Sequence, residues 1–261
     1  MKKLMAMLLA SAMVLSLAAC GASEDTENKG TLKIGFTYFE PMNYLDDQGE
    51  FVGFETEFAT AVCEQMGVKP EFVEINCDSK VMELESKNID CIWNGMTITP
   101  ELQEALTISD PYIKNYQVIV IRSENADLYT DTASLAGKTV EAEAGSAGEA
   151  AIADDENLSQ ATYVSVTKQT DALLEVKTGA ADAAVMDFVL ANALAGKGDY
   201  SDLMVIPGLE LSVEEYGVGF RKDDTELAGK VNDAMQALID DGTLNTLAEK
   251  YGLAELLLAN Q

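Results

Sequence analysis

The stretch IDCIWNGMTITPELQE, residues 89–104, decides how this chain folds. The short apolar run Cys91 to Trp93 predicts a strand, and Asn94-Gly95 predicts the tight turn that follows it. Thr99 and Pro100 suit the N-cap and the first turn of a helix. Glycine lets the backbone approach a ligand closely, and free NH groups at a helix start attract an anion. We therefore expect a small molecule to sit here.

The residues on either side of this stretch alternate between strand and helix patterns. Phe54 to Met66 has apolar residues on a repeating face, and Gly67 follows as a stop signal. The other predicted elements are strands at 32–36 and 71–75 and a helix at 81–87. Alternating strands and helices predict an α/β lobe.

A second series of strands and helices follows, which predicts a second α/β lobe. Tyr116 to Arg122 is an apolar strand that leaves the first lobe, and Glu215 to Phe220 would carry the chain back. Between them the predicted strands are 139–143, 162–166, 183–186 and 203–206, with helices after Ala147, from 171 to 177 and after Asp187. Two crossings predict a hinge. The last helices, 225–240 and 243–251, should pack on the first lobe.

The N-terminus has the pattern of a secretion signal. Lys2 and Lys3 precede an apolar run from Leu4 to Leu17, which is shorter than the roughly 20 residues that span a bilayer. Leu-Ala-Ala-Cys20 is similar to a bacterial lipobox, which implies cleavage before Cys20 and lipid attachment there; the alternative is an ordinary signal with a coincidental cysteine. We expect residues 1–19 to be a lipoprotein signal peptide and residues 20–30 to be a disordered tether, because they are small and polar.

Composition excludes several classes of function. Removal of Lys2 and Lys3 with the signal lowers the formal charge from −28 to −30, which argues against nucleic-acid binding and for a soluble monomer held at the cell membrane only by its lipid. The chain has no histidine, so Ser-His and Cys-His nucleophiles and His-bearing metal sites are excluded. Cys63, Cys77 and Cys91 are an odd number outside the cell, so at least one thiol is free.

The segment 89–104, with Ser109-Asp-Pro-Tyr112 after it, resembles extracellular solute-binding proteins of family 3, the amino-acid receptors of ABC importers. Asp241-Gly-Thr-Leu near the C-terminus resembles the end of those proteins, so the likeness covers residues 31–253. It implies an α/β, two-lobed periplasmic-binding-protein type II fold with two hinge crossings. Lobe 1 would comprise 31–115 and 218–261, and lobe 2 would comprise 116–217.

The same resemblance implies a non-enzymatic function without cofactor or metal. The protein would be an extracytoplasmic, lipid-anchored binding protein that captures an amino acid or amine and delivers it to an ABC permease. One residue departs from the family pattern. The arginine that grips the ligand carboxylate with two parallel hydrogen bonds falls on Leu102, and Arg122 and Arg221 are the only arginines. Lys80 is a candidate substitute.

Ligand contacts from the second lobe are expected at two strand ends. Asp187 would receive the ammonium group of the ligand, with an N-cap role for the following helix as the alternative. Gly145, Ser146 and Ala147 would bind a carboxylate as an anion nest, although glycine and serine before a helix are also ordinary turn chemistry. Glu143, which shares its facing with Glu141, indicates a pocket that accepts positive charge, with solvent exposure as the alternative.

The first lobe would contribute an aromatic ring and the turn after its strand. Phe39 would stack on the ligand, with core packing as the alternative. Trp93 and Asn94 point to opposite sides of a strand, and the resemblance selects Asn94 for the cleft. The predicted ligand-binding residues are Phe39, Cys77, Asn94, Gly95, Met96, Thr97, Glu143, Gly145, Ser146, Ala147 and Asp187.

Two other functions fit the same residues. Some relatives of this fold are dehydratases of cyclic carboxylates, and Glu143 with Asp187 could then do acid–base work. The third hypothesis is an orphan ligand sensor that signals to a membrane receptor.

Overall fold

The computed structural model describes residues 30–261. The predicted signal peptide, the lipidation site Cys20 and most of the predicted tether lie outside the described residues. Thr31–Gln261 forms one compact unit. No helix within residues 30–261 combines the length and the apolar character that a membrane span requires.

One five-stranded sheet organises the first lobe. Its strand order is β4-β1-β5-β12-β6. Strand β1 is parallel to both β4 and β5, whereas β12 is antiparallel to both β5 and β6. The bounds are β1 Thr31–Phe36, β4 Lys69–Glu74, β5 Cys91–Ile92, β6 Leu106–Ile108 and β12 Gly219–Arg221. A hairpin of β2 Tyr44–Leu45 and β3 Phe51–Val52 adjoins it, and the helices are α1 Phe54–Met66, α2 Lys80–Glu85, α3 Pro100–Ala105, α7 Thr225–Asp240 and α8 Thr243–Lys250.

A second five-stranded sheet organises the other lobe. Its order is β11-β7-β10-β8-β9, with β8 parallel to β9 and β10, and β7 antiparallel to β10 and β11. The bounds are β7 Ile113–Arg122, β8 Thr139–Glu143, β9 Thr162–Val166, β10 Ala183–Asp187 and β11 Leu203–Tyr216, with helices α4 Ala147–Asp154, α5 Gln169–Thr178 and α6 Phe188–Leu194. Single 3₁₀ turns occur at Cys77–Ser79, Ser123–Asn125, Ala133–Leu135, Leu158–Gln160, Gly198–Tyr200, Ala254–Leu256 and Leu258–Asn260.

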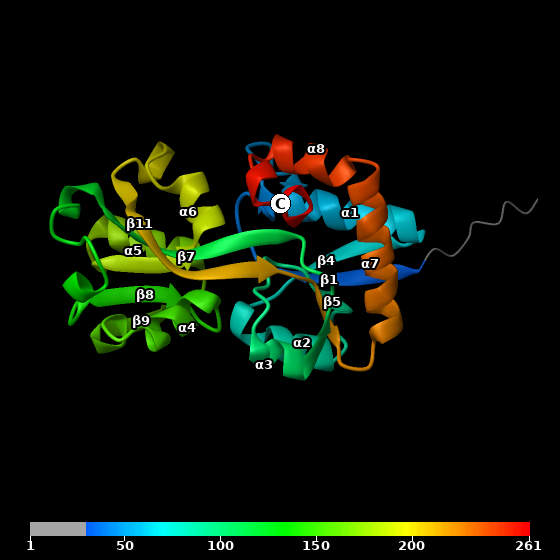
Figure 1. Ribbon diagram of the computed structural model, residues 1–261, viewed down its shortest axis with the longest axis horizontal. Coiled ribbons are helices and arrows are strands. Elements are labelled where there is room, and N and C mark those ends of the chain that lie inside the picture. Colours follow the sequence, from blue (N-terminus) through cyan, green and yellow to red (C-terminus); the bar gives the residue numbers. More distant parts are fainter. Residues whose placement is uncertain (1–29) are drawn as a thin grey trace, which may run out of the picture. The chain divides into compact units, whose positions relative to one another are not determined.

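Two crossings connect the lobes, as Figure 1 shows for the green β7 and the orange β11. The first lies between β6 and β7, and the second lies between β11 and β12. The sequence predicted a strand that ends at Ile206, but β11 continues to Tyr216 in one run. Register shifts between Val205 and Glu210 and between Glu210 and Ser212 absorb the irregular segment, because a bulge takes up extra residues without ending the ladder.

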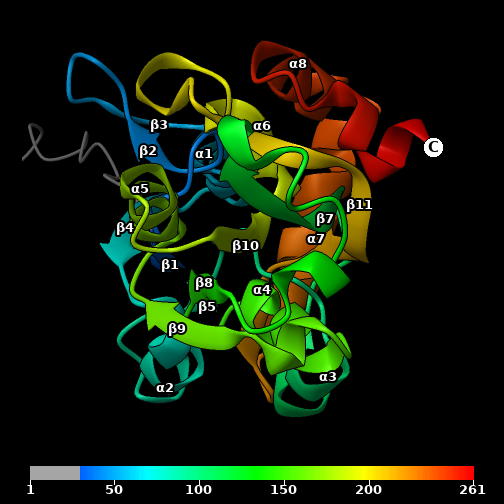
Figure 2. The same ribbon diagram turned by 90° about the vertical axis from the view of Figure 1, so that its left-hand side faces the viewer.

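Helices cover the sheets of both lobes, and their boundaries follow the sequence signals. In Figure 2 the lobe of β8, β9 and β10 faces the viewer, with α4 and α5 beside its strands. Gly67 ends α1 and Gly179 ends α5, each with a positive φ. As expected, α7 and α8 pack on the first lobe, where they share a core with α1.

The core of the first lobe is aromatic. Trp93, Tyr112, Phe54 and Phe58 are almost completely buried and contact one another through their rings. Two of the three free cysteines in the described part of the chain, Cys63 and Cys91, have no exposed surface and pack as small buried hydrophobes.

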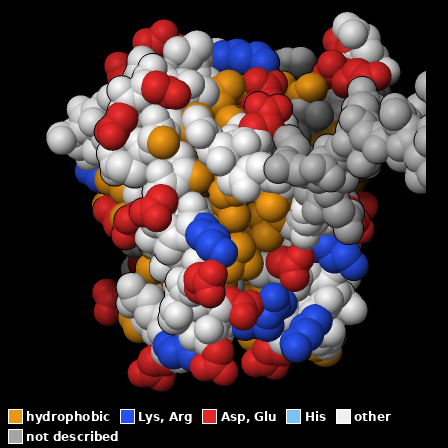
Figure 3. Space-filling model, turned by 90° about the vertical axis from the view of Figure 1, so that its right-hand side faces the viewer, with side chains coloured by type: hydrophobic (Ala, Val, Ile, Leu, Met, Phe, Trp, Pro, Cys, Tyr) orange, Lys and Arg blue, Asp and Glu red, His pale blue; other side chains and the backbone are white. Residues whose placement is uncertain are grey.

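The outer face of the first lobe has Asp and Glu side chains interspersed with Lys and Arg around an apolar central area (Figure 3). The charged surface agrees with the excess of 45 acids over 17 basic residues in the chain.

Candidate functional site

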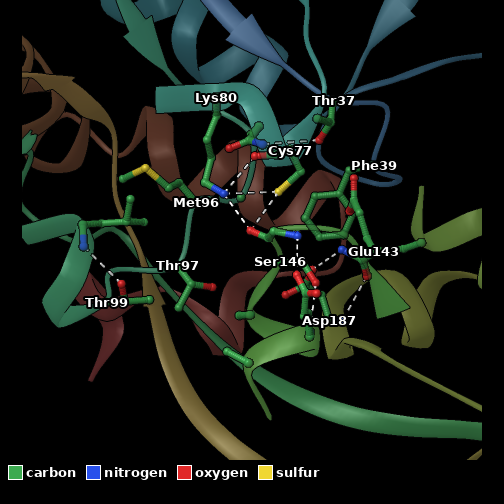
Figure 4. Close-up of a pocket in the computed structure, with 18 of the residues that line it drawn as sticks. Thr37, Phe39, Cys77, Lys80, Met96, Thr97, Thr99, Glu143, Ser146 and Asp187 are labelled. Atoms are coloured by element: carbon green, nitrogen blue, oxygen red, sulfur yellow. Dashed lines mark hydrogen bonds between the residues drawn. The ribbon is translucent and has the colours of Figure 1, made fainter. Parts of the chain in front are cut away.

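A cavity of about 400 Å³ lies between the two lobes. Its lining contains every residue that the sequence predicted for ligand binding. The first lobe contributes Phe39, Cys77, Asn94, Gly95, Met96 and Thr97, and the second contributes Glu143, Gly145, Ser146, Ala147 and Asp187. Figure 4 shows side chains from both lobes turned toward the same space. Folding thus gathers residues that are up to 148 positions apart, Phe39 and Asp187.

Asp187 lies at the end of β10 and is buried, with 7% of its surface exposed. Its Oδ1 accepts hydrogen bonds from Gln117 Nε2 and Tyr216 OH, each at 2.8 Å, and from Asn115 Nδ2 at 2.5 Å. Gln169 Nε2 donates to Oδ2. Burial, and then the negative charge of Glu214, raise the pKa of this carboxyl to about 6.

The structure does not show the alternative role for Asp187, which was a side-chain cap for the following helix. Asp187 occupies the N-cap position of α6, but its side chain makes no capping hydrogen bond. The carboxylate faces the cavity and is held there by neutral amide and hydroxyl donors. Asp187 therefore presents to a ligand a negative charge that has no cationic partner among residues 30–261.

Glu143 ends β8 beside Asp187 and is 6% exposed. Burial, followed by the negative charge of Asp187, raises the pKa of Glu143 to about 8, while Lys80 acts in the opposite direction. The alternative of solvent exposure is therefore wrong for Glu143. It is also wrong for Glu141, which is 5% exposed but lies outside the cavity lining, with Oε2 lacking a partner. Glu141 lies two residues before Glu143 in β8, farther from the end of the strand that lines the cavity.

The turn at Gly145 and Ser146 makes hydrogen bonds with Glu149, which belongs to the helix that follows it. Ser146 caps α4 by accepting a hydrogen bond from Glu149 N at 3.2 Å, and Gly145 N donates to Glu149 Oε2 at 2.6 Å. This reciprocal pattern is similar to a capping box. The backbone NH that the sequence offered to a ligand carboxylate is thus bound to a carboxylate of the chain itself.

The turn at Gly95 also differs from expectation. Its φ is +66°, and a Cβ there would lie 2.5 Å from Phe39 Cε1, so the glycine makes room for a ring of the protein rather than for a ligand. Gly95 N donates to both carboxylate oxygens of Glu55 at 2.9 Å. Phe39, which is 4% exposed, both packs in the core and lines the cavity.

Glu55, which was not predicted as a functional residue, holds the first-lobe turn at Gly95, which is part of the cavity wall. It is 1% exposed and accepts hydrogen bonds from Asn43 Nδ2 at 2.7 Å and from Tyr112 OH. Burial raises the pKa of Glu55 to about 7. Next to this wall, Asn94 lines the cavity whereas Trp93 is buried in the core. Strand alternation predicted opposite sides for the two residues, and the family resemblance selected Asn94.

Lys80 is the single cation in the cavity lining formed by residues 30–261. Its Nζ donates to Gly145 O at 2.7 Å and to Cys77 O at 3.0 Å, so it links the two lobes. A second link between the lobes is Lys168 Nζ, which lies 3.0 Å from Glu74 Oε1 and 5.1 Å from the Tyr38 ring centroid.

Neither arginine is part of the cavity lining. Arg122 donates to Val176 O, and Arg221 donates to Leu84 O and Ile89 O and pairs with acids near the first sheet. Leu102, which stands where the family arginine would be, lines the cavity. The guanidinium clamp is therefore missing from this site in space as well as in sequence.

The remaining lining residues could have been found only in part from the sequence. Those not predicted as ligand contacts are Thr37, Thr99, Glu101, Leu102, Glu149, Ala150, Ala153 and Gln169, whereas Lys80 was predicted only as a candidate substitute for the family arginine. Glu149, Ala150 and Ala153 lie three, four and seven residues after Ser146, which is the spacing of one helix face. Within residues 30–261 no group of acids and cysteines could hold a metal ion.

The model of bacterial extracellular solute-binding proteins, family 3, matches residues 32–254. This chain belongs to that family. It is 29% identical to the arginine-binding extracellular protein ArtP of Bacillus subtilis (strain 168), over 98% of this chain and 100% of that protein.

Solved structures of family members share the fold. The arginine-bound form of truncated ArgBP from T. maritima superposes with a TM-score of 0.74 at 35% identity, covering 80% of this chain and 96% of that one. An ancestral amino-acid-binding protein, described as a precursor of cyclohexadienyl dehydratase, gives a TM-score of 0.77 at 32% identity, with 85% and 95% covered. The two-lobed, type II fold of this extracellular solute-binding protein is thereby confirmed.

Proposed function

We propose that this family 3 protein is the substrate-binding component of an ABC importer and captures an amino acid or a related amine between its lobes. The observation that carries the proposal is the buried Asp187 carboxylate, which faces a cavity lined by both lobes and has no cationic partner in the described part of the chain. A carboxylate in that setting binds an ammonium group far more strongly than an exposed one does. Phe39 adds a ring face that attracts cations.

In this proposal binding and lobe closure are one process. The lobes comprise residues 31–115 with 218–261 and residues 116–217, and the hinge lies where the chain crosses between them. Each lobe supplies part of the lining, so a ligand contacts both only when they are closed. The ligand then stabilises the closed form by its higher affinity for that form. The closed, loaded protein is what a permease would recognise.

A thermal-shift screen of amino acids, amines and short peptides tests this function, with mass spectrometry of solutes that co-purify. We expect a stabilising nitrogenous ligand in wild type and a much smaller shift in Asp187→Asn. If no amine or amino acid raises the melting temperature of the correctly folded protein, the proposal is wrong.

The proposal includes an extracytoplasmic, lipid-anchored monomer, with the lipid on Cys20. A protein with the Cys20→Ser change should be released into the soluble fraction, whereas wild type should remain with the membrane. Size-exclusion chromatography with light scattering should give the mass of one chain for the soluble form.

A dehydratase activity is the competing candidate, because one similar structure belongs to a precursor of such an enzyme. The raised pKa of Glu143, about 8, would suit a general acid. We expect no turnover of prephenate-like compounds, since the named relatives are binding proteins. Product formation that is lost in Glu143→Gln would favour the enzyme instead.

A further inference from the structure

We propose that the ligand is a small organic cation that lacks a carboxylate, of the diamine or guanidino-amine class, rather than an α-amino acid. This inference rests on the proposed binding function and narrows the ligand class of the same cavity.

The charges of the lining favour a cation. Within residues 30–261 the cavity lining has four acidic side chains, which are Glu101, Glu143, Glu149 and Asp187, and one ammonium group, that of Lys80. Glu143 holds a proton in the empty cavity and contributes its negative charge when a cation enters. Glu143 and Asp187 are at least nine-tenths buried, so water screens them poorly. A ligand with one or two positive charges and no negative charge balances this wall. A ligand carboxylate adds another anion to it.

Several donors that could hold a carboxylate already have partners. Lys80 Nζ is bound to two carbonyl oxygens, and Gly145 N is bound to Glu149. Gly95 N is bound to Glu55, and Thr97 Oγ1 donates to Glu214 Oε2 at 2.9 Å. A ligand carboxylate that used one of these four groups would have to displace its present partner. Such an exchange contributes little net affinity.

One acceptor in the wall of the cavity, in contrast, lacks a partner. Within residues 30–261 the Oδ1 atom of Asn94 has no hydrogen-bond partner, although the residue is 6% exposed and lines the cavity. A buried acceptor without a partner is costly, and a ligand N–H satisfies it if the Asn94 side chain moves slightly, because the atom itself is almost inaccessible. Donors that already have partners and an acceptor without one favour a ligand that donates hydrogen bonds, as ammonium and guanidinium groups do.

Matched ligand pairs that differ only in the carboxylate test the inference. The pairs are arginine with agmatine, lysine with cadaverine and ornithine with putrescine, measured by calorimetry on the wild-type protein at pH 8. We expect the decarboxylated member of the best-bound pair to bind at least about tenfold more tightly, which corresponds to about 1.4 kcal/mol.

The other outcomes separate this inference from the proposed function. Equal or tighter binding of the amino acids overturns the inference and leaves the binding function intact. If neither member of any pair binds, and no other amine or amino acid does, both are overturned.

A gain-of-function variant provides the second test. Leu102→Arg places a cation in the cavity lining, whereas the exposed neighbour Gln103, which lies outside that lining, provides the control variant Gln103→Arg with the same charge. We expect Leu102→Arg to shift the preference toward the amino acid by at least about tenfold and Gln103→Arg to leave it unchanged. An unchanged preference in folded Leu102→Arg overturns the inference, because a missing cation would not then explain the selectivity.

Discussion

The proton of Glu143 should make the ligand-free protein less stable as the pH rises. A free glutamate has a pKa of 4.5, and burial beside Asp187 raises that of Glu143 to about 8. Between these pH values the folded state keeps a proton that the unfolded state has lost. Stability is therefore fully present below about pH 4.5 and falls as the pH rises toward 8, by up to about 1.4 kcal/mol per pH unit. From pH 6 to pH 8.5 this one group removes roughly 2 to 3 kcal/mol.

Glu143→Gln removes that loss, because glutamine stays neutral at every pH. We would measure urea denaturation of ligand-free wild type and Glu143→Gln at pH 6 and pH 8.5. The fall in unfolding free energy should be roughly 2 to 3 kcal/mol smaller in the variant. Glu55 and Asp187 titrate in both proteins, so the difference between the two proteins reports Glu143 together with its coupling to Asp187. Glu101→Gln, at an exposed position of the same lining, should behave like wild type.

Equal pH dependence in wild type and Glu143→Gln would refute this reasoning, because it would mean that Glu143 ionises without a burial penalty. The same proton links pH to binding. A cationic ligand favours ionised Glu143, so binding should release a proton and tighten as the pH rises from 6 to 8, by at most about tenfold per unit. Calorimetry in two buffers of different ionisation enthalpy would measure the released proton.

Three further predictions concern the site and its frame. Asp187→Asn should weaken ligand binding by about 30-fold or more while the protein stays folded, because the neutral donors remain but the charge is lost; calorimetry with circular dichroism checks both. Gly95→Ala should cost about 2 kcal/mol or more of unfolding free energy in urea titrations, since its φ is positive and the new methyl would meet the Phe39 ring; wild-type stability would contradict this. Lys168→Met should weaken ligand binding only a few-fold and open the lobes slightly in small-angle scattering, because exposed ion pairs contribute below about 1 kcal/mol. The control is Lys230→Met, which breaks an ion pair within one helix and should change neither the ligand affinity nor the small-angle scattering.

The sequence was sufficient for most of the elements and for the positions that line the cavity, because both depend on local rules. Pro100 after Thr99 fixes a helix start, and the hydrogen bond from Leu102 N to Thr99 Oγ1 at 3.2 Å confirms it. Strand alternation was sufficient to separate Trp93 from Asn94. The predicted contacts stand at strand ends and helix starts, where an α/β fold places its cavity.

Glu55 and Gln169 show what the sequence could not reveal. Glu55 looks like an ordinary first-turn acid of α1, yet it is buried against Gly95 and Tyr112, which lie 40 and 57 residues away. Gln169 becomes a partner of Asp187 only because β9 and β10 end at the same edge of one sheet. Neither relation leaves a periodic or spacing signal in the chain.

By itself the sequence determined the family, the two α/β lobes, the absence of a histidine and the lack of an arginine at Leu102, since each is a property of residue identity or short-range order. Only the tertiary structure decided which donors remain available in the cavity. Whether Gly145 N, Gly95 N and Lys80 Nζ are free depends on Glu149, Glu55 and the opposite lobe being within hydrogen-bond distance. Hydrogen bonds act over about 3 Å, so their pairing is decided only when the lobes are folded and packed together.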